Sequence, residues 1–563
     1  MSEVPMLLDA TQLPSGASID ADVAVVGAGP VGIVLALELA RAKLRVALIE
    51  SGGGRWDAAA QSLGDTAADE PPHHPMSLAT RRQIGGTSNL WAGRCVPFDP
   101  IDFIARPIAG NVSWPLAYEE IERYHARACE WFVCGPPAFD VTQIPSLAGR
   151  SLIPGWPGGE IRATALERWS LPTNFRRRYG AELRRSPLVT LVQRLTCTEI
   201  VCAAGGASVE HLACRTLNGR RVTVRARRHV LACGGLGSTR LLFASDRHHA
   251  GGIGNHSDHL GRWYMSHIEC RIAEAHFATP PGATIHDFER DPGGVYVRRR
   301  FTFATELLLE HDLPNAALWP VNPELGDAAH RSGTLSLLYL LMSSPLGPRM
   351  LSEATRLVQL ITARPSPTRA HLANIARTPG PTTRFALSFG YERFLRPGRK
   401  APGVFVARPA NVYPLFYQAE HAPNRASVVA RSGERDALGM PRLSTRMRFS
   451  DSDIEGVMRV HAQLDRYLRR HRLGHLKYLH HGPELTAAAI RGRLVGGYTQ
   501  AGTTRMSERP RDGVVDRNLA VHGFYDLYVA SSSAFPTSGQ ANTTFMIVVL
   551  ALRLADHLRE ALG

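Results

Sequence analysis

The N-terminal fifty residues alternate apolar runs with glycine. A continuous apolar run that ends at Val26 is typical of a buried parallel strand. Three glycines follow it with the spacing G-x-G-x-x-G, at Gly27, Gly29 and Gly32. Residues 34–42 have the periodicity of a helix, residues 45–49 predict a second strand, and Glu50 closes that strand. The pattern predicts a strand–helix–strand unit of the Rossmann type, which binds a dinucleotide.

Each part of this unit has a physical role in holding a dinucleotide. Gly27 permits the tight turn, Gly29 lets the backbone approach a pyrophosphate, and Gly32 lets the helix pack closely on the strand. The N-terminus of the helix faces the phosphates. Glu50 lies about 20 residues further on, where a carboxylate accepts hydrogen bonds from the ribose.

The same kind of pattern returns twice later in the chain. Residues 221–230 alternate, residues 230–233 are apolar, and the glycines of 234–238 open a predicted helix at Thr239. A short buried strand is predicted at 527–530 and a final helix from about Phe545. We therefore expect an α/β cofactor domain made from both ends of the chain, within a protein that is α+β overall.

The middle of the chain differs from its ends. Residues 263–491 are irregular, with alternating strands and many Pro and Gly residues, which suits an inserted, sheet-containing substrate domain. The cofactor domain is then expected at 1–262 and 492–563, with loop segments over the cofactor at about 76–180. Within the insert, residues 348–375 form a basic amphipathic stretch. An ordinary packed helix explains this stretch best, and contact with a membrane or action as a lid are the alternatives.

The amino-acid composition argues against a membrane-spanning protein, a disulfide-rich protein and a nucleic-acid-binding protein. The 44% apolar and 20% charged residues are ordinary for a soluble globular protein, and no apolar run approaches the roughly 18 residues that span a bilayer. With no recognisable secretion signal, we expect a cytoplasmic enzyme. The eight cysteines lack a redox or zinc motif, so we expect reduced, mostly buried thiols and no metal site. The net charge of +15 comes from scattered arginines, which argues against nucleic acid but could attract an anionic substrate.

Several further motifs occur together in a recognisable order. They are the segments 85–91 (GGTSNLW), 113–124 (SWPLAYEEIERY), 420–428 (EHAPNRASV), 436–442 (DALGMPR), 502–506 (GTTRM), 514–516 (VVD), 527–529 (LYV) and 535–542 (FPTSGQAN). With the N-terminal unit, these segments resemble the glucose–methanol–choline (GMC) oxidoreductase family over nearly the whole chain. The segments 113–124, 420–428 and 436–442 are similar to those of the bacterial branch, which includes sugar dehydrogenases and pyranose-oxidase-like enzymes.

The resemblance implies FAD, with its flavin ring between the two domains. The residues that it and the N-terminal unit assign to the cofactor are Gly27, Gly29, Pro30, Gly32, Glu50, Ser51, Gly85, Gly86, Ser88, Asn89, Leu90, Trp91, Ala92, Cys197, Ala232, Ser531, Ser532, Asn542, Thr543 and Thr544. Some relatives attach FAD covalently through a His just before the Trp of the second motif. Leu90 holds that place here, so we expect noncovalent FAD.

One position departs from the family pattern. Relatives oxidise an alcohol by passing hydride to flavin N5 while a His takes the hydroxyl proton, and a second His or Asn hydrogen-bonds the same oxygen. Asn542 matches the second position, but Thr499 stands at the first and its neighbour Gln500 is no base. A general base is worth roughly 10²- to 10⁴-fold in rate.

Three explanations of this departure stay open. The base can come from elsewhere, with His267, His480 and His481 as candidates, although any single His is more often structural. The substrate can need little proton removal, or the flavin can serve an altered reaction. We therefore expect an FAD-dependent dehydrogenase or oxidase of a hydroxylated small molecule. The alternatives are a flavoenzyme that performs desaturation, rearrangement or elimination in a biosynthetic pathway, and a flavin-binding protein without catalysis. The sequence leaves the electron acceptor open among dioxygen, a quinone and a redox protein.

Overall fold

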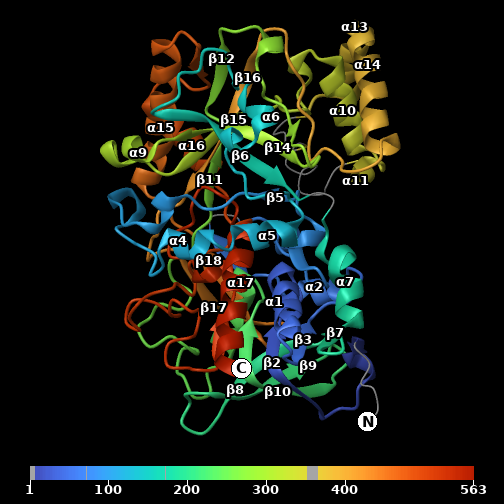
Figure 1. Ribbon diagram of the computed structural model, residues 1–563, viewed down its shortest axis with the longest axis vertical. Helices are drawn as coiled ribbons and strands as arrows, with labels where there is room; N and C mark the ends of the chain where they lie inside the picture. Colours follow the sequence, from blue (N-terminus) through green and yellow to red (C-terminus); the bar gives the residue numbers. More distant parts are fainter. Residues whose placement is uncertain (1–6, 71–72, 171–172, 351–359, 361–364) are drawn as a thin grey trace.

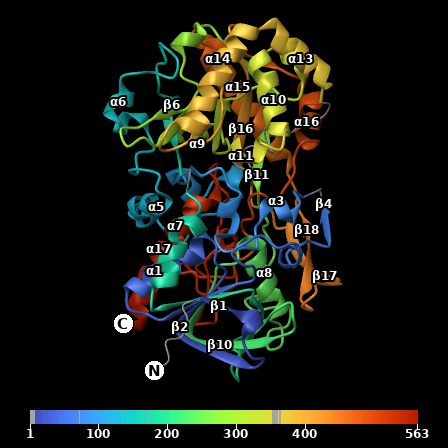
Figure 2. The same ribbon diagram turned by 90° about the vertical axis from the view of Figure 1, so that its right-hand side faces the viewer.

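Two sheets, one at each end of the molecule, organise the computed structural model (Figure 1). The structure describes residues 7–70, 73–170, 173–350, 360 and 365–563. Both termini lie at the end that holds the first sheet, and the second sheet lies with most of the helices from the middle of the chain (Figure 2).

The first sheet has the predicted Rossmann-type centre. Its strands run in the order β1 (Leu7–Asp9), β7 (Val189–Gln193), β3 (Val46–Glu50), β2 (Ala17–Val26), β10 (Arg221–Leu231), β9 (Val209–Arg215) and β8 (Thr196–Cys202), with β20 (Leu527–Val529) paired to β10. The pairs from β1 through β10 are parallel, as is the pair of β10 with β20, whereas β9 and β8 form an antiparallel extension. The N-terminal and C-terminal parts of the chain therefore share one sheet, as predicted.

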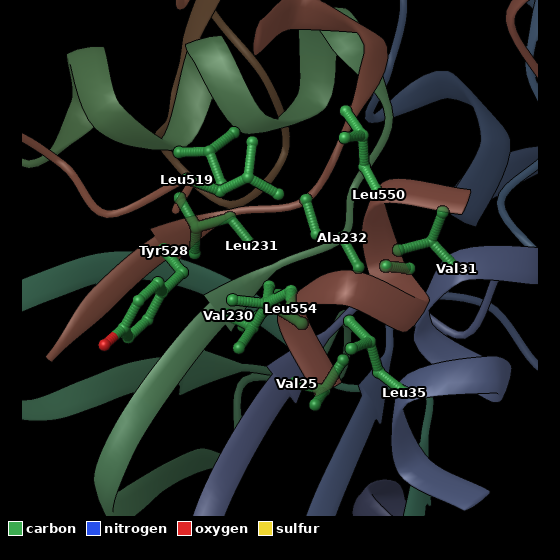
Figure 3. Close-up of a cluster of buried hydrophobic side chains, with 14 of the residues drawn as sticks. Val25, Val31, Leu35, Val230, Leu231, Ala232, Leu519, Tyr528, Leu550 and Leu554 are labelled. Carbon is green, nitrogen blue, oxygen red and sulfur yellow. The ribbon is translucent and has the colours of Figure 1, made fainter. Parts of the chain in front are cut away.

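Two helices cover this sheet and bury its core. Helix α1 (Pro30–Arg41) begins four residues earlier than the apolar periodicity predicts, because Pro30 is well suited to the first helical position. It packs against α17 (Thr543–Leu562), the predicted final helix. Figure 3 shows Val31 and Leu35 of α1 beside Leu550 and Leu554 of α17, above the strands that carry Val25 and Val230. These side chains are all at most 4% exposed, so the helix pair is fixed on the sheet.

The second sheet presents two different faces. Its strands run in the order β19 (Gly474–Tyr478), β12 (Ala273–Phe277), β16 (Val412–Glu420), β15 (Ala316–Pro320), β14 (Tyr296–Phe303), β6 (Ile161–Trp169) and β5 (Arg94–Cys95), with β11 (His267–Cys270) paired to β16 and β13 (Glu289–Arg290) to β14. Because side chains alternate along a strand, Ile268, Leu318 and Leu415 point into a core that also contains Ile454 and Val457 of α15 (Asp451–Arg470). The residues between them form the opposite face, which bears the polar residues described below.

The chain crosses between the two sheets several times. Strands β5 and β6 precede residue 263 but belong to the second sheet. Conversely, β17 (Val428–Arg435) pairs with β18 (Pro441–Arg446), and β18 pairs with β4 (Ala68–Glu70). Both β17 and β18 contact α8 (Gly235–Ala244), which follows β10. Both domains thus contain segments from either side of residue 263, and the domain bounds given by the sequence stay a prediction.

The helices from the middle of the chain flank the second sheet. They include α10 (Gly333–Ser343), α13 (Thr368–Arg377) and α14 (Pro379–Gly390). Nearly half of the predicted amphipathic stretch lies outside the described residues, at 351–359 and 361–364. None of the helices that the structure describes has the length and apolar character needed to cross a membrane. Seven of the eight cysteines are buried and all eight are unpaired, in agreement with the sequence prediction.

Candidate active site

The turn between β2 and α1 is built so tightly that only glycine fits at two of its positions. Gly27 has a φ of +107°, and a Cβ there would lie 2.5 Å from the carbonyl oxygen of Ala232. A Cβ on Gly32 would lie 1.8 Å from the carbonyl oxygen of Gly27. Gly29 begins α1 without a side-chain cap, so the first backbone N–H groups of the helix are available to an anion.

The second glycine motif packs directly on this turn. Gly86 has a φ of +52°, and a Cβ there would lie 2.8 Å from Cα of Gly29. The Gly85 N–H donates to the carbonyl oxygen of Ala28 over 2.7 Å. Side chains within the motif hold its shape, because Ser88 Oγ donates to the carbonyl oxygen of Gly85 and Asn89 Nδ2 donates to that of Gly86. Two loops that the sequence assigned separately to the cofactor therefore lie against each other.

Glu50 is bound by the backbone on both sides. Its Oε2 accepts from the N–H of Ala28 over 2.9 Å, and its Oε1 accepts from the N–H of Gly52 over 2.8 Å. Burial raises the pKa of Glu50, and these two backbone hydrogen bonds oppose the rise. Each oxygen keeps a lone pair for a ribose hydroxyl.

These loops border a large cavity. Its empty volume is about 1670 Å³, part of which is open to solvent. The predicted cofactor residues that line it are Gly27, Gly29, Pro30, Glu50, Ser51, Gly86, Ser88, Trp91, Cys197, Ala232, Ser531, Ser532, Thr543 and Thr544, together with Gln500. The predicted residues that are not among its lining are Gly32, Gly85, Asn89, Leu90, Ala92, Thr499 and Asn542. Gly85 and Asn89 instead support the loop that lines the cavity, and Leu90 is 5% exposed.

Sequence reasoning missed an arginine in this cavity. Arg82 lines the wall, and its Nη1 donates to Ser51 Oγ over 2.8 Å. Arg240 lines it too, but its guanidinium is paired with Asp436 over 2.7 Å. The signal that could have identified Arg82 is the pair of arginines just before the second glycine motif.

Thr499 contacts one of the three candidate bases. Its Oγ1 lies 2.9 Å from Nδ1 of His267, which is on β11. Both side chains are buried, at 4% and 5% exposure, and the ring's Nε2 has no hydrogen-bond partner among the described residues. Burial, with a smaller contribution from the positive charge of Arg94, lowers the pKa of His267 to about 4. The imidazole is therefore neutral at pH 7 and able to accept a proton.

The other two candidate histidines lie elsewhere. His480 and His481 are in the turn after β19, and His481 is exposed. Among the described contacts, neither ring is joined to Thr499 or Asn542. Gln500 is tied to the backbone, because its Oε1 accepts from the N–H of Leu236 and its Nε2 donates to the carbonyl oxygen of Gly497. Of the three candidates, His267 is the one whose ring contacts Thr499 among the described residues.

Asn542 is oriented by two side chains of the second sheet. As the residue that precedes α17, it presents its Oδ1 to Nη1 of Arg94 over 3.0 Å and to Nε2 of Gln418 over 3.3 Å. Because both donors bind the oxygen, the amide Nδ2 is left to donate to another group, and it has no acceptor among the described residues. A substrate oxygen is the acceptor that this geometry favours.

Comparison with known proteins agrees with the motifs. Residues 423–551 match the family model described as GMC oxidoreductase. A 2-methyl-1,2-propanediol dehydrogenase of Mycolicibacterium austroafricanum is 23% identical over 312 residues, which are 44% of this chain and 55% of the relative. The chain thus matches only about half the length of that curated relative.

Solved structures match over almost the whole chain. An FAD-dependent oxidoreductase from Chaetomium thermophilum is 14% identical with a TM-score of 0.55, covering 96% of this chain and 99% of that one. Pyridoxine 4-oxidase from Mesorbium loti is 17% identical with a TM-score of 0.51, covering 95% and 98%. At these identities the likeness establishes the fold, a Rossmann-type domain joined to a substrate domain. Residues 423–551 thus resemble GMC oxidoreductases, and the fold of nearly the whole chain is similar to that of the two solved oxidoreductases.

Proposed function

We propose that this protein binds FAD noncovalently and oxidises the CH–OH group of a small organic molecule to a carbonyl. The observation that carries the proposal is the hydrogen bond between Thr499 and His267, which supplies a proton acceptor at the position where the family motif has lost one. The match of residues 423–551 to the GMC oxidoreductase model supports the class of reaction.

The residues around the cavity fit FAD. The turn at Gly27 and Gly29 and the open N-terminus of α1 suit the diphosphate, and Arg82 adds a positive charge on the same wall. Glu50 is placed to accept hydrogen bonds from the ribose. Leu90 has no atom that could form a bond to the flavin, which supports noncovalent binding. Bound FAD would supply the acceptor for the hydride that leaves the substrate carbon.

Thr499 and His267 would together remove the hydroxyl proton. When the neutral ring of His267 carries its hydrogen on Nε2, the Thr499 hydroxyl donates to Nδ1, and its oxygen keeps lone pairs that can accept from a substrate O–H. As the substrate proton moves to Thr499 Oγ1, the Thr499 proton moves to Nδ1, so the threonine ends unchanged and the ring ends protonated. Arg94 and burial both disfavour that imidazolium, so the proton should return to solvent before the next turnover.

Asn542 would hold the same substrate oxygen. With its Oδ1 bound by Arg94 and Gln418, its Nδ2 can donate to the hydroxyl as it becomes a carbonyl. A fixed donor of this kind is typically worth roughly 10²- to 10³-fold in rate. Thr499 and Asn542 therefore come from two different segments of the C-terminal region, and each is contacted by side chains of the second sheet.

A reductive titration tests the proposal. Purified protein should be yellow, and acid or heat should release unmodified FAD into the supernatant. Under anaerobic conditions we expect 2-methyl-1,2-propanediol, pyridoxine or another primary alcohol to bleach the flavin and yield a product that is two mass units lighter. The first two probes are the compounds named for the relatives. Adding dioxygen or a quinone to the bleached enzyme then identifies the electron acceptor.

Three outcomes would contradict the proposal in different ways. A colourless protein that cannot be reconstituted with FAD would contradict FAD binding. FAD that stays with the denatured chain would contradict noncovalent binding. A product of unchanged mass, formed while the flavin stays oxidised, would favour the altered chemistry of rearrangement. Bound FAD that no alcohol reduces would favour a flavin-binding protein without this catalysis.

A further inference from the structure

Three arginines surround one buried carboxylate on the polar face of the second sheet. Glu167 on β6 is fully buried, and its Oε2 lies 2.7 Å from Nε of Arg94 on β5. Its Oε1 accepts from Nε of Arg298 on β14 over 2.6 Å. Arg300 is two residues further along β14, so its side chain is on the same face, and its charge also acts on Glu167. We call Arg94, Arg298 and Arg300 the arginine cluster.

The cluster has more donors than the protein has acceptors for them. Each guanidinium carries five N–H donors. Apart from Glu167, the described acceptors are the side-chain oxygens of Gln418 and Asn542 for Arg94, and of Gln540 for Arg300. Nη2 of Arg94 and Nε of Arg300 are buried and have no hydrogen-bond partner among the described residues. Unpaired charged donors are costly to bury, so the site favours a further acceptor.

The positive charge is only partly neutralised within the site. Glu167 is the single carboxylate in contact with the cluster among the described residues. Asp99 is separated from Arg300 by the amide of Gln540, which donates to it over 3.0 Å. The charges of Asp287 and Glu269 act on Arg298 and Arg94, but burial raises the pKa of both carboxyl groups. Burial also lowers the pKa of Arg300 to about 10, which leaves it protonated at pH 7.

Aromatic side chains pack against the arginine cluster and give the site an apolar surface. The guanidinium carbons of Arg94 and Arg298 lie 4.7 Å and 5.0 Å from the centre of the Trp319 ring. Phe416 packs on the same tryptophan, with ring centres 4.9 Å apart. A ligand with an apolar body and one negative group fits such a wall better than an inorganic anion does.

We propose that the arginine cluster binds a carboxylate of the substrate, so that the substrate is a hydroxy acid. The proposal rests on the proposed function, which places the substrate hydroxyl at Asn542. Arg94 connects the proposed hydroxyl site with the proposed carboxylate site, because its Nη1 donates to Oδ1 of Asn542 while its buried Nη2 has no partner among the described residues. Hydroxyl and carboxylate sites are therefore adjacent, which favours a short hydroxy acid over a long one.

Binding of a carboxylate that cannot be oxidised tests the inference without turnover. Benzoate is titrated into the FAD-loaded protein, with methyl benzoate as the neutral probe of similar shape, and the dissociation constant is read from the flavin difference spectrum and from calorimetry. We expect benzoate to bind at least about tenfold more tightly than the ester, because a buried guanidinium–carboxylate pair is a charge-assisted hydrogen bond.

Two variants assign the effect to the cluster. Arg298→Gln removes a charge without touching Asn542, and Arg300→Gln serves if the first variant does not retain FAD. Each should weaken benzoate binding by about tenfold or more and leave ester binding unchanged. Arg470→Gln is the matched control, because the described contacts of this exposed arginine are with Glu160, His471 and Tyr467 and with none of the cluster residues.

The outcomes separate the inference from the proposed function. Equal binding of acid and ester, absent binding of both, or benzoate binding that survives both cluster variants overturns the inference, even if alcohols still bleach the flavin. Selective benzoate binding that depends on the cluster supports it, even if the tested alcohols do not react. If the alcohols do not react, the reductive titration contradicts the proposed function, whereas the benzoate titration does not test it.

Discussion

The side chains of Thr499 and His267 meet across 232 positions of sequence, with Oγ1 and Nδ1 2.9 Å apart. The threonine belongs to the C-terminal segment and the histidine to β11 of the second sheet. The pair therefore brings a titratable ring to a position where the local sequence offers none. Substitutions at Thr499 and His267 can distinguish a role of this pair in proton transfer from a role in packing.

Removing either partner should slow flavin reduction. We expect His267→Gln to lower the anaerobic reduction rate by roughly 10²- to 10⁴-fold, the usual worth of a general base. Thr499→Val should have a comparable effect because it breaks the path to Nδ1, whereas Thr499→Ser keeps the hydroxyl and should stay close to wild type. Stopped-flow absorbance with a reacting alcohol measures each rate. Unchanged reduction in His267→Gln would rule out the ring as the acceptor.

The pH dependence of the wild-type rate is a separate test. Because the pKa of His267 is lowered to about 4, the accepting neutral form is already complete well below pH 6.5. The reduction rate should therefore be flat from about pH 6 upward and fall only as the pH approaches 4. A fall centred near pH 6.5 would show instead that an ordinary, solvated histidine controls the reaction.

Restoring the family residue should harm this protein. Thr499 is 4% exposed and lies against His267, so Thr499→His places a second ring in filled space at a cost of about 1–3 kcal/mol. We expect a lower melting temperature and slower reduction. The swap Thr499→His/His267→Thr should recover part of both losses, because it returns the volume to nearly its original value. Faster turnover in the single variant would show that the site still accommodates the family's base.

Asn542 and its supports should affect catalysis without affecting FAD binding. Asn542→Ala should lower the reduction rate by roughly 10²- to 10³-fold through loss of the oxygen donor. Gln418→Leu leaves Arg94 as the remaining described donor to Asn542 Oδ1, so a smaller loss is expected. FAD content, measured by absorbance per chain, should match wild type in both. Equal rates in Asn542→Ala and wild type would exclude a role at the substrate oxygen.

Glu50→Ala should weaken FAD binding and also destabilise the protein without FAD. Its carboxylate is expected to bind ribose, and charge-assisted hydrogen bonds are worth roughly 1.5–3 kcal/mol. The structure adds a second effect, because the N–H groups of Ala28 and Gly52 would lose their acceptor. Fluorescence titration of FAD and thermal unfolding of the apoprotein measure the two effects. The exposed Glu182→Ala is the control, and unchanged FAD affinity in Glu50→Ala would make the carboxylate purely structural.

The sequence predicted the parts of the fold that depend on local pattern. The strand–turn–helix at Gly27 and the return of β20 to the first sheet follow from apolar runs and glycine spacing. The membership of β5 and β6 in the second sheet could not be predicted, because strand pairing across hundreds of residues leaves no periodic signal. The domain bounds drawn from the sequence stay a prediction.

The sequence predicted only those residues of the candidate site that belong to a recognisable motif. The motifs identified Thr499 as a departure and His267 as one of three candidates, but only the fold shows which ring lies beside Thr499. Arg94 and Gln418 carry no motif, and their contact with Asn542 joins residues 448 and 124 positions apart. Such orienting contacts arise from packing of the two domains, so a single sequence does not reveal them.

The pairing of β20 with β10 also sets the order in which the protein can be built on the ribosome. The second sheet is complete once Tyr478 has been made, so it can form while the chain is still growing. The first sheet still lacks the partner for residues 229–231 of β10 and the apolar cover that α17 provides. Until those residues emerge, the nascent chain displays an unfilled strand edge and an uncovered apolar surface, which chaperones bind and which promote aggregation. A premature stop before residue 527 should therefore yield insoluble protein even though most of the chain is present.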